Sequence, residues 1–317
     1  LNNFSDADGD LPGIAITGTN LQGGRLWYSV DDGSTWFDGS AVSYFTPRLL
    51  AADATTRLYF EPAADFSGTI SDVIAFKAWD RNSIWQQRGA DIDGEAADDR
   101  SGNSVSMSAD GQTMAIGAFY NDGNGIDSGH VRIYRWTGSA WSQRGADIDG
   151  EAADDRSSWS VSMSADGQTV AIGAITNDDN GSNSGHVRIY DWTGSAWIQR
   201  GADIDGEAAD DYSGGSVSMS SDGQTVAIGA YGNDGNGSDS GHVRIYRWKD
   251  EDDAWIQRGA DIDGEAAEDF SGWSVSMSAD GQTVAIGAYR NDGNGSNSGH
   301  VRIYDWTDAG WIQRGAD

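Results

Sequence analysis

The chain has 317 residues and carries 50 acidic against 20 basic side chains, for a formal net charge of −30. A surface this acidic repels the phosphate backbone of nucleic acids and the headgroups of anionic membranes, which excludes nucleic acid as a partner. No apolar run approaches the length of a membrane-spanning helix, so we expect no membrane insertion. Cysteine is absent, which excludes disulfides and thiolate metal sites, while 44 glycines against three prolines predict many tight turns.

Residues 1–82 differ from the rest of the chain, because they contain all three prolines and no copy of the repeat that follows. The run Asp31–Ser34 (DDGS) predicts a hairpin turn between Trp27 and Trp36. Runs rich in β-branched and aromatic residues predict strands at Gly13–Thr17, Leu26–Val30, Thr56–Phe60 and Val73–Trp79. The size of the segment and the spacing of its strands favour a small β-sandwich.

An acidic cluster opens this segment, with Asp6, Asp8 and Asp10 in the sequence S-D-A-D-G-D. Alternate carboxylates on a turn supply several oxygen ligands at once, as calcium requires. The later glutamate of an EF-hand loop is missing, so the pattern is only part of a calcium signature. The cluster is either a calcium site or a solvated acidic turn.

From residue 83 onward the sequence repeats. The phrase W-x-Q-R-G-A-D begins at Trp85, Trp141, Trp197, Trp255 and Trp311, with spacings of 56, 56, 58 and 56 residues. A period of that length, filled with short strands, is typical of β-propeller blades rather than of a helical solenoid. Copies therefore start near residues 85, 141, 197 and 255, and a last, partial copy starts at 311.

Each copy predicts four antiparallel strands, which together make one blade. In the first copy the sequence Ala109–Gln112 (ADGQ) forms a hairpin turn between two apolar runs, and apolar and polar residues alternate in H-V-R-I-Y-R-W. The strands are expected at Ser104–Ser108, Thr113–Ala118, His130–Trp136 and Trp141–Gly145. The fold class is therefore all-β, a propeller over residues 83–317 preceded by a β-sandwich. Because last-strand phrases flank the four copies on both sides, we expect the blades to belong to a larger ring.

Two acidic loops recur in every copy, and antiparallel topology brings them to the same edge of the blade. Carboxylates crowded at this density repel one another, and a cation among them offsets the repulsion. Every available ligand is a hard oxygen, so we expect Ca²⁺, with solvated acid as the alternative interpretation. The candidate ligands are Asp91, Asp93, Glu95 and Asp122 in the first copy, and at the matching positions Asp147, Asp149, Glu151, Asp178, Asp203, Asp205, Glu207, Asp234, Asp261, Asp263, Glu265 and Asp292.

The positions that vary between copies lie at the same edge and are often aromatic. Aromatic rings beside metal-binding carboxylates make a candidate site for a sugar or a protein. The alternative is ordinary packing at the rim, since single exposed aromatic residues are common. The candidate ligand-binding residues are Tyr120, Trp159, Tyr231, Trp273 and Tyr289.

Each copy also holds one histidine, and the four are His130, His186, His242 and His300. They are related by the repeat, and no second histidine, cysteine or activated serine lies beside them in the sequence. A catalytic site requires one asymmetric set of acid, base or nucleophile. The sequence therefore predicts a structural role for the histidines and a chain that is not an enzyme.

The repeat resembles the bacterial FG-GAP repeat, through S-G-W-S-V-S-M-S-A-D-G-Q-T-V-A-I-G-A at Ser271–Ala288 and N-D-G-N-G-S-N-S-G-H-V-R-I-Y at Asn291–Tyr304. The resemblance covers about residues 83–317 and implies a propeller, usually of seven blades. The position of the family's opening Phe is kept at Phe270 but holds Arg100, Arg156 and Tyr212 in the other copies. The long calcium loop of integrin-type repeats is here a short A-D-G-Q turn, so that calcium site is not carried over.

Residues 1–82 resemble the cadherin-like, immunoglobulin-type modules of large bacterial surface adhesins, in WYSVDDGSTW, RLYFEP and AFKAWD. Together the two resemblances imply a calcium-dependent adhesion module at the bacterial cell surface, covalently continuous with further adhesin domains. Its ligand would be a cell-surface glycan or protein. The alternatives are a structural spacer without a ligand of its own and a polysaccharide-active enzyme.

Overall fold

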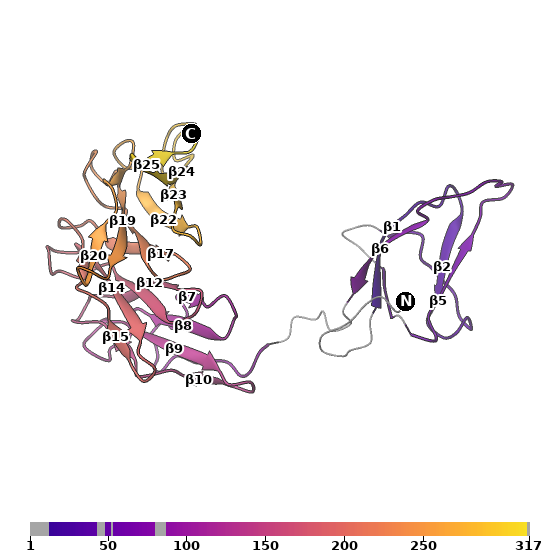
Figure 1. The fold of residues 1–317 in the computed structure, drawn as a ribbon, viewed down its shortest axis with the longest axis horizontal. Helices are drawn as coiled ribbons and strands as arrows, with labels where there is room; N and C mark the ends of the chain where they lie inside the picture. Colours follow the sequence, from indigo (N-terminus) through magenta and orange to yellow (C-terminus); the bar gives the residue numbers. More distant parts are fainter. Residues whose placement is uncertain (1–12, 43–47, 52, 80–86, 316–317) are drawn as a thin grey trace. The chain divides into compact units, whose positions relative to one another are not determined.

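The computed structural model describes residues 13–42, 48–51, 53–79 and 87–315, and in this part of the chain all regular structure is β-strand. The chain divides into two compact units, Leu1–Gln87 and Arg88–Asp317 (Figure 1). The boundary expected between residues 82 and 83 lies outside the described residues. No helix in the described ranges is long and apolar enough to cross a membrane.

The first unit contains two three-stranded antiparallel sheets. One has the order β4-β1-β6 and the other β3-β2-β5. Buried Ile14, Ile16, Leu26 and Leu50 come from both sheets and form one core, as in a sandwich. The strands are β1 (Gly13–Thr19), β2 (Arg25–Ser29), β3 (Phe37–Asp38), β4 (Arg48–Ala51), β5 (Arg57–Glu61) and β6 (Ile74–Trp79). The short strands β3 and β4 were not expected from the sequence.

The second unit consists of four blades, each a meander of four antiparallel strands, as the repeat predicted. The first blade contains β7 (Ser104–Met107), β8 (Thr113–Ala118), β9 (His130–Trp136) and β10 (Trp141–Gln143). The second contains β12 (Ser157–Met163), β13 (Thr169–Ala174), β14 (His186–Trp192) and β15 (Trp197–Gln199). The third contains β17 (Ser213–Met219), β18 (Thr225–Ala230), β19 (His242–Lys249) and β20 (Ala254–Gln257). The fourth contains β22 (Ser271–Met277), β23 (Thr283–Ala288), β24 (His300–Thr307) and β25 (Gly310–Gln313).

A short strand that the sequence did not predict connects consecutive blades. The three examples are β11 (Ile148–Asp149), β16 (Ile204–Asp205) and β21 (Ile262–Asp263). Each pairs antiparallel with the start of the third strand of the blade before it, so Asp205 lies opposite His186 and Ile204 opposite Val187. This pairing brings the linker of one copy against the histidine of the preceding copy.

Neighbouring blades pack face to face through the apolar side chains of their central strands. Val131 and Ile133 of the first blade share a core with Met163, Val170 and Ile172 of the second. The same arrangement returns between the second and third blades and between the third and fourth. Burial of this apolar surface holds the blades together, since hydrogen bonds within a blade contribute nothing to their stacking.

An arginine in each linker fastens the outer edge of consecutive blades. Arg144 donates to the Gly167 carbonyl at 2.7 Å, and its guanidinium lies over the rings of Trp192 and Trp197 at 4.6 and 5.5 Å. The Trp197 Nε1 donates to the backbone oxygen of Arg144 at 2.8 Å. The linker is therefore held by hydrogen bonds and by a cation–π stack at once.

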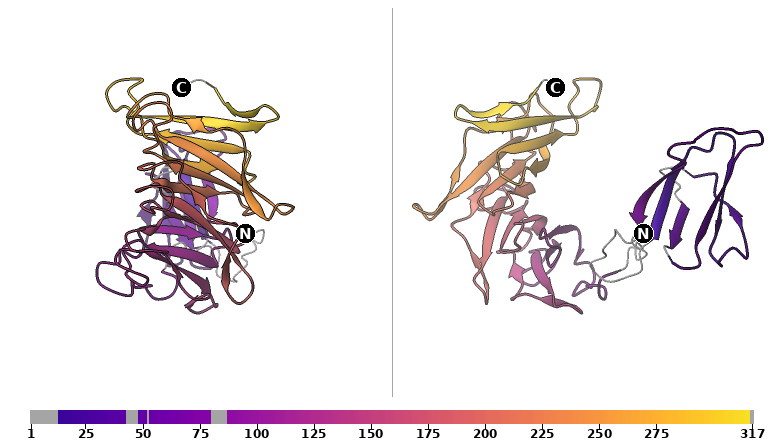
Figure 2. Two further views of the ribbon diagram at one scale, coloured as in Figure 1. Left: turned by 90° about the vertical axis from the view of Figure 1, so that its left-hand side faces the viewer. Right: turned by 45° about the vertical axis from the view of Figure 1, so that its right-hand side comes forward.

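The outward faces of the first and fourth blades are uncovered among the described residues. Val105 is 65 % exposed and Val301 is 62 % exposed, whereas Val187, the counterpart of Val301 in the second blade, is fully buried. Figure 2 shows the four blades following one another in chain order. The apolar alternation of these strands is thus the same in all copies, and burial depends on having a neighbour.

Candidate metal centre and aromatic face

The histidine of each copy is the first residue of the third strand of its blade. His130, His186 and His242 are at most 1 % exposed, and their Nε2 atoms have no hydrogen-bond partner among the described residues. In His186 the Nδ1 atom is also buried without a partner. A buried polar nitrogen without a partner is uncommon and requires an explanation.

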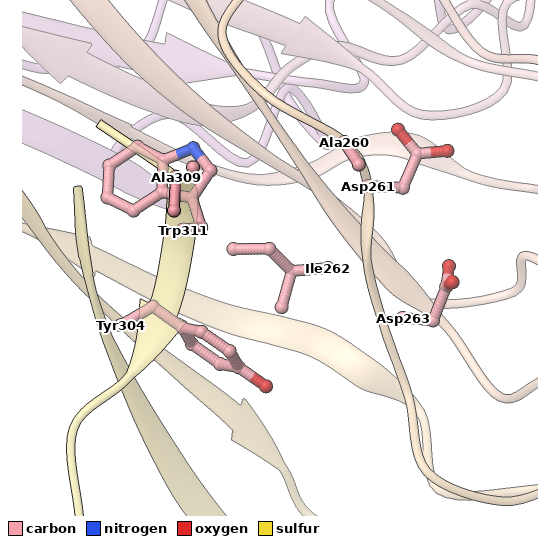
Figure 3. A pocket seen from close by; sticks show the side chains of 8 residues that line it. Ala260, Asp261, Ile262, Asp263, Tyr304, Ala309 and Trp311 are labelled. Carbon is pink, nitrogen blue, oxygen red and sulfur yellow. The ribbon is translucent and has the colours of Figure 1, made fainter. Parts of the chain in front are cut away.

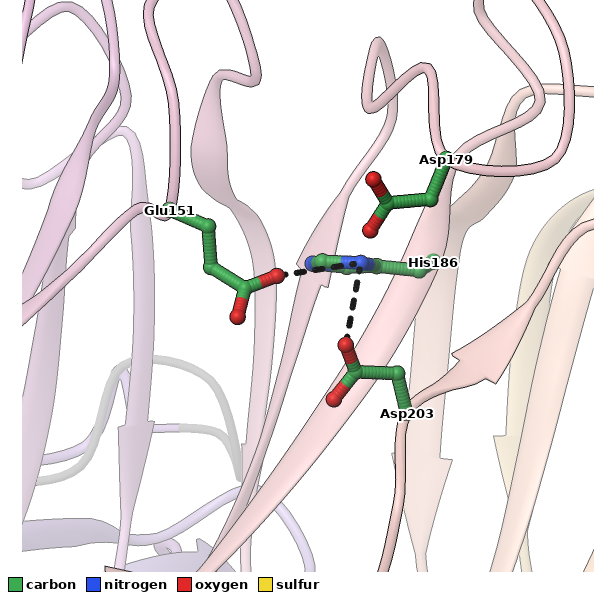
Figure 4. A group of neighbouring side chains, drawn as sticks. All are labelled: Glu151, Asp179, His186 and Asp203. Carbon is green, nitrogen blue, oxygen red and sulfur yellow. Dashed lines mark ion pairs between the residues drawn. The ribbon is translucent and has the colours of Figure 1, made fainter.

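Carboxylates from two linkers surround the Nδ1 atom of each of these histidines. His186 Nδ1 lies 3.8 Å from Glu151 Oε2 and 3.9 Å from Asp203 Oδ2 (Figure 4). Glu151 follows β11, in the linker into the second blade, and Asp203 precedes β16 in the linker out of it. The same grouping recurs as Glu95, His130 and Asp147, and as Glu207, His242 and Asp261.

The second cluster has a fourth member, Asp179. Its side chain joins Glu151, His186 and Asp203, with one ligand atom from each residue lying within 4.8 Å of the others. The matching positions in the other copies are Gly123, Gly235 and Gly293, so N-D-G-N-G becomes N-D-D-N-G in the second copy alone. The clusters are therefore not equivalent.

The electrostatics of the second cluster favour a cation. Burial raises the pKa of Glu151, and the charges of Asp203 and Asp179 raise it further against the opposing effect of Arg188. Burial lowers the pKa of His186 to about 4, and Arg188 adds to this. The lowered pKa favours the neutral imidazole, which is the form that ligates metals. Arg188 pairs with Glu151 at 3.5 Å, and three carboxylates converge beside this one cation.

Only part of the ligand set expected from the sequence converges in these clusters. The residues that converge are three glutamates, Glu95, Glu151 and Glu207, and three aspartates, Asp147, Asp203 and Asp261. Each of these aspartates comes from the linker that follows the blade of its histidine. In the fourth copy, Glu265 Oε2 lies 3.6 Å from His300 Nδ1. Asp93 contributes its backbone oxygen to Arg132 at 2.6 Å instead.

A second acidic loop, Asn121–Gly129 in the first copy, directs its first aspartate toward its own backbone. Asp122 Oδ1 accepts from the Asp127 amide at 2.9 Å, and Asp178, Asp234 and Asp292 repeat this contact. Asp149, Asp205 and Asp263 lie in the pairing strands of the linkers. Asp6, Asp8 and Asp10 lie outside the described residues. Sequence reasoning did not propose Asp179 or the histidines as ligands, although the single departure from N-D-G-N-G was visible.

A small pocket lies beside the linker into the fourth blade. Its volume is about 250 Å³, and Ile262 points between Trp311 and Tyr304 while the carboxylates of Asp261 and Asp263 point away (Figure 3). A pocket of similar size is lined by the matching residues of the first copy, among them Ile92, Tyr134 and Trp141. Ordinary small-molecule sites begin near 300 Å³, so these pockets do not define the site.

Aromatic side chains form a continuous row across the third and fourth blades. Tyr212 stacks on Tyr231 at 5.3 Å with their planes 8° apart, and the Tyr231 ring meets that of Trp273 at 4.8 Å. Trp273 in turn meets Tyr289 at 4.7 Å. We call Tyr212, Tyr231, Trp273 and Tyr289 the aromatic row. Trp273 is 45 % and Tyr289 41 % exposed, so the row presents ring surface to solvent.

Gly215 explains how the row is assembled. It occupies the position of Trp159 and Trp273 in other copies, and a Cβ there would lie 2.7 Å from the Tyr231 ring. The absence of a side chain lets Tyr231 lie over the backbone. The other predicted residues, Tyr120 and Trp159, both lie beside Phe119, with ring centroids 4.2 and 5.0 Å from its own.

The residue at the opening Phe position has left-handed backbone in every copy. Arg100, Arg156, Tyr212 and Phe270 have φ between 52° and 57°. Such angles are costly for bulky residues and persist only where surrounding contacts impose them. The Tyr212 amide, for example, donates to the Asn183 carbonyl of the preceding blade at 3.1 Å.

Four blades of repeated β-meanders, joined by pairing linkers, define a β-propeller. The FG-GAP repeat model matches residues 91–134, 147–190, 203–246 and 261–304, which together are more than half of the chain. The chain belongs to the FG-GAP repeat family. None of the curated proteins compared matches the sequence. The resemblance of residues 1–82 to a cadherin-like adhesin module finds no match in these comparisons.

Comparison with solved structures gives matches at low sequence identity. The periplasmic gluconolactonase PpgL of Pseudomonas aeruginosa is 14 % identical with a TM-score of 0.46, over 92 % of this chain and 67 % of its own. A putative 6-phosphogluconolactonase from Bacteroides uniformis is 11 % identical with a TM-score of 0.45, over 94 % and 82 %. The β-propeller domain of the Trilobed protease from Pyrococcus furiosus, with an open velcro topology, is 12 % identical with a TM-score of 0.39, over 66 % and 55 %. The chain spans about half the length of two structural neighbours, the Pyrococcus furiosus propeller domain and the hydrazine synthase of Kuenenia stuttgartiensis.

These neighbours correct the expectation that the chain is not an enzyme. Two of them are named as lactonases, so the proteins similar to this chain include enzymes, and the exclusion drawn from the sequence does not hold. The physical flaw lay in treating the copies as equivalent. Asp179 makes one histidine–carboxylate cluster different from the others. At these identities the likeness concerns the fold alone and transfers no substrate.

Proposed function

We propose that this chain is an extracellular adhesion module of a large bacterial surface protein, in which the aromatic row binds a cell-surface glycan or protein. The observation that carries the proposal is the row itself, in which Trp273 and Tyr289 are in ring contact and substantially exposed. Flat, rigid aromatic rings bind the apolar faces of sugars and anchor protein interfaces at little entropic cost. The cadherin-like resemblance of residues 1–82 supports the adhesin context.

Divalent cations are the second part of the proposed function. The clusters around His130, His186 and His242 draw ligands from the linkers on both sides of a blade, so a bound ion would tie the two linkers to the blade. An ion that binds only the folded form stabilises it by about 2.7 kcal/mol at a hundredfold excess over its dissociation constant. Calcium remains our prediction for the acidic loops.

The test is binding of the full chain to arrays of glycans and of extracellular proteins. We expect selective binding that is lost in the double variant Trp273→Ala, Tyr289→Ala, while circular dichroism remains unchanged. Ile126→Ala is the matched control, because Ile126 is 70 % exposed and lies outside the row. Absence of any ligand would favour a structural spacer, and turnover of a polysaccharide would favour an enzyme.

A further inference from the structure

We propose that Glu151, Asp179, His186 and Asp203 bind a divalent transition metal of the zinc type, and that this is the tightest metal site of the chain. The inference deepens the metal-binding part of the proposed function. It differs from the calcium prediction in three ways. The ion is a transition metal, Asp179 and His186 are added as ligands, and only the second copy of the repeat holds the complete site.

The donor set argues for the class of ion. Three carboxylates and one imidazole give four ligands, which is the usual number for zinc, whereas calcium takes six to eight oxygens. Imidazole nitrogen suits zinc and its neighbours in the first transition row, and it is a poor ligand for calcium and magnesium. His186 Nδ1 is fully buried, has no hydrogen-bond partner among the described residues and faces the carboxylates (Figure 4).

The four ligand atoms lie within 4.8 Å of one another, farther apart than around a bound ion, so the side chains must move closer to bind one. The distances of 3.8 and 3.9 Å from His186 Nδ1 to Glu151 and Asp203 compare with an edge of about 3.4 Å in a tetrahedron with bonds of about 2.1 Å. The side chains of Glu151 and Asp203 are 40 % and 24 % exposed. Arg188 pairs with Glu151 Oε1 and Gln199 donates to Asp203 Oδ1, which leaves the other oxygen of each carboxylate directed at His186. The imidazole is fixed by its place at the start of β14.

Arg188 orients the glutamate of the site. Its Nη1 lies 3.5 Å from Glu151 Oε1, on the opposite oxygen from the one that faces His186, and its Nη2 donates to the Asp149 carbonyl at 2.7 Å. The guanidinium thereby holds one carboxylate oxygen and leaves the other directed at the imidazole. Such supporting contacts are typical of metal sites.

Asp179 separates this cluster from its relatives. Its amide donates to Asn177 Oδ1 at 3.0 Å, as the Gly123 amide donates to Asn121 Oδ1 at 2.8 Å, so the two loops have the same local structure. Neither residue has positive φ. An aspartate placed at position 123 should therefore reach the first cluster as Asp179 reaches the second.

The experiment is isothermal titration of the metal-stripped full chain with Zn²⁺, Mn²⁺, Ca²⁺ and Mg²⁺, without any glycan or protein ligand. We expect one equivalent of Zn²⁺ to bind more tightly than Ca²⁺. Asp179→Gly should weaken that site at least about tenfold, since even supporting residues of metal sites cost 10- to 100-fold. Gly123→Asp should add a second tight equivalent, and Glu207→Gln, in the third cluster, should leave the tight site unchanged.

Visible absorption of the Co²⁺-loaded chain gives an independent reading of the coordination number. Tetrahedral Co²⁺ bands that vanish in His186→Gln would support the site. Equal or tighter binding of Ca²⁺ would overturn the choice of ion, and unchanged Zn²⁺ affinity in Asp179→Gly would overturn the ligand set. Because no adhesion ligand is present, failure here leaves the array result of the proposed function untouched.

We also infer that the uncovered faces of the first and fourth blades bind another blade of the same repeat, which in a solution of this chain comes from a second copy. The internal interfaces supply the template. Val301 and Ile303 of the fourth blade match Val187 and Ile189, which are buried against the third blade. Met107 of the first blade is 53 % exposed, while its counterpart Met163 is 7 % exposed beneath its neighbour.

The two faces are therefore the two sides of one interface that the chain already makes three times. Continuity with those interfaces, and not apolar exposure alone, identifies the occupant. The contact would be head to tail, because the two sides differ.

The test is the molar mass of the full chain by light scattering over a range of concentrations. We expect assembly as concentration rises, and its loss in Met107→Asp or in Val301→Asp. Met107→Asp leaves the face of the fourth blade intact, and Val301→Asp leaves the face of the first blade intact. A mixture of the two variants should therefore form dimers. Ile198→Asp, at a position 55 % exposed on the outer strand β15, is the control and should assemble as wild type does. A folded monomer at every concentration, or assembly retained in both face variants, would overturn the inference.

Discussion

Two isoleucines at the same strand position allow the energy of blade packing to be measured within one chain. Ile189 of β14 is 2 % exposed beneath the third blade, and Ile303 of β24 is 38 % exposed on the uncovered face. Replacement by alanine removes three carbons, worth about 0.8 kcal/mol each when fully buried. For Ile189 the cavity left behind adds to this about 2.4 kcal/mol, for a total of about 3–5 kcal/mol.

For Ile303 the same change should cost only about 1–1.5 kcal/mol, because the side chain keeps part of its surface in water and no enclosed cavity forms. A unit of this size loses about 2–4 °C of melting temperature per kcal/mol. Calorimetry of the full chain at low concentration should therefore give a loss of roughly 6–20 °C for Ile189→Ala and roughly 2–6 °C for Ile303→Ala. Equal losses would refute the argument that burial between blades, rather than strand formation, stabilises the propeller.

Three further predictions concern single side chains of the blades. Burial, with Tyr212 and Tyr289 close by, raises the pKa of Tyr231 from 10.0 to about 12. In the unfolded chain the same hydroxyl therefore loses its proton at a lower pH, near 10. The stability that neutral Tyr231 contributes should thus be lost as pH rises from 10 toward 12, and absorbance titration at 295 nm should show a late-titrating tyrosine that is missing in Tyr231→Phe. Ser220 Oγ accepts from the buried Thr225 amide at 2.9 Å, and Ser220→Ala should cost about 1–3 kcal/mol in chemical unfolding, with a loss below 0.5 kcal/mol contradicting the role of this turn. Arg144→Lys keeps the positive charge but removes the planar guanidinium that lies over the Trp192 ring while it donates to the Gly167 carbonyl. It should therefore lower the melting temperature almost as much as Arg144→Ala does. A melting temperature fully restored by lysine would contradict the importance of the stacked geometry.

The elements of each blade could be predicted because their causes are local. The A-D-G-Q turn and the alternation of H-V-R-I-Y-R-W depend on neighbours in sequence, and β8 and β9 begin and end where these patterns do. The linker strand β16 could not be predicted in this way. Ile204–Asp205 is too short to have a pattern of its own, and it forms only because β14 offers an unpaired edge beyond β15.

The candidate site, too, was predictable only in its residue types and not in their contacts. The sequence by itself determined which residue types were available: recurring carboxylates, one histidine per copy, and a single aspartate at position 179 where the other copies have glycine. Only the tertiary structure decided which of them meet. Glu151 and Asp203 belong to linkers on opposite sides of a blade, more than fifty residues apart, and the pairing of β11 and β16 brings both to His186. Asp178 is adjacent to Asp179 in the chain, yet its side chain bonds its own loop, because successive residues of a turn point in different directions.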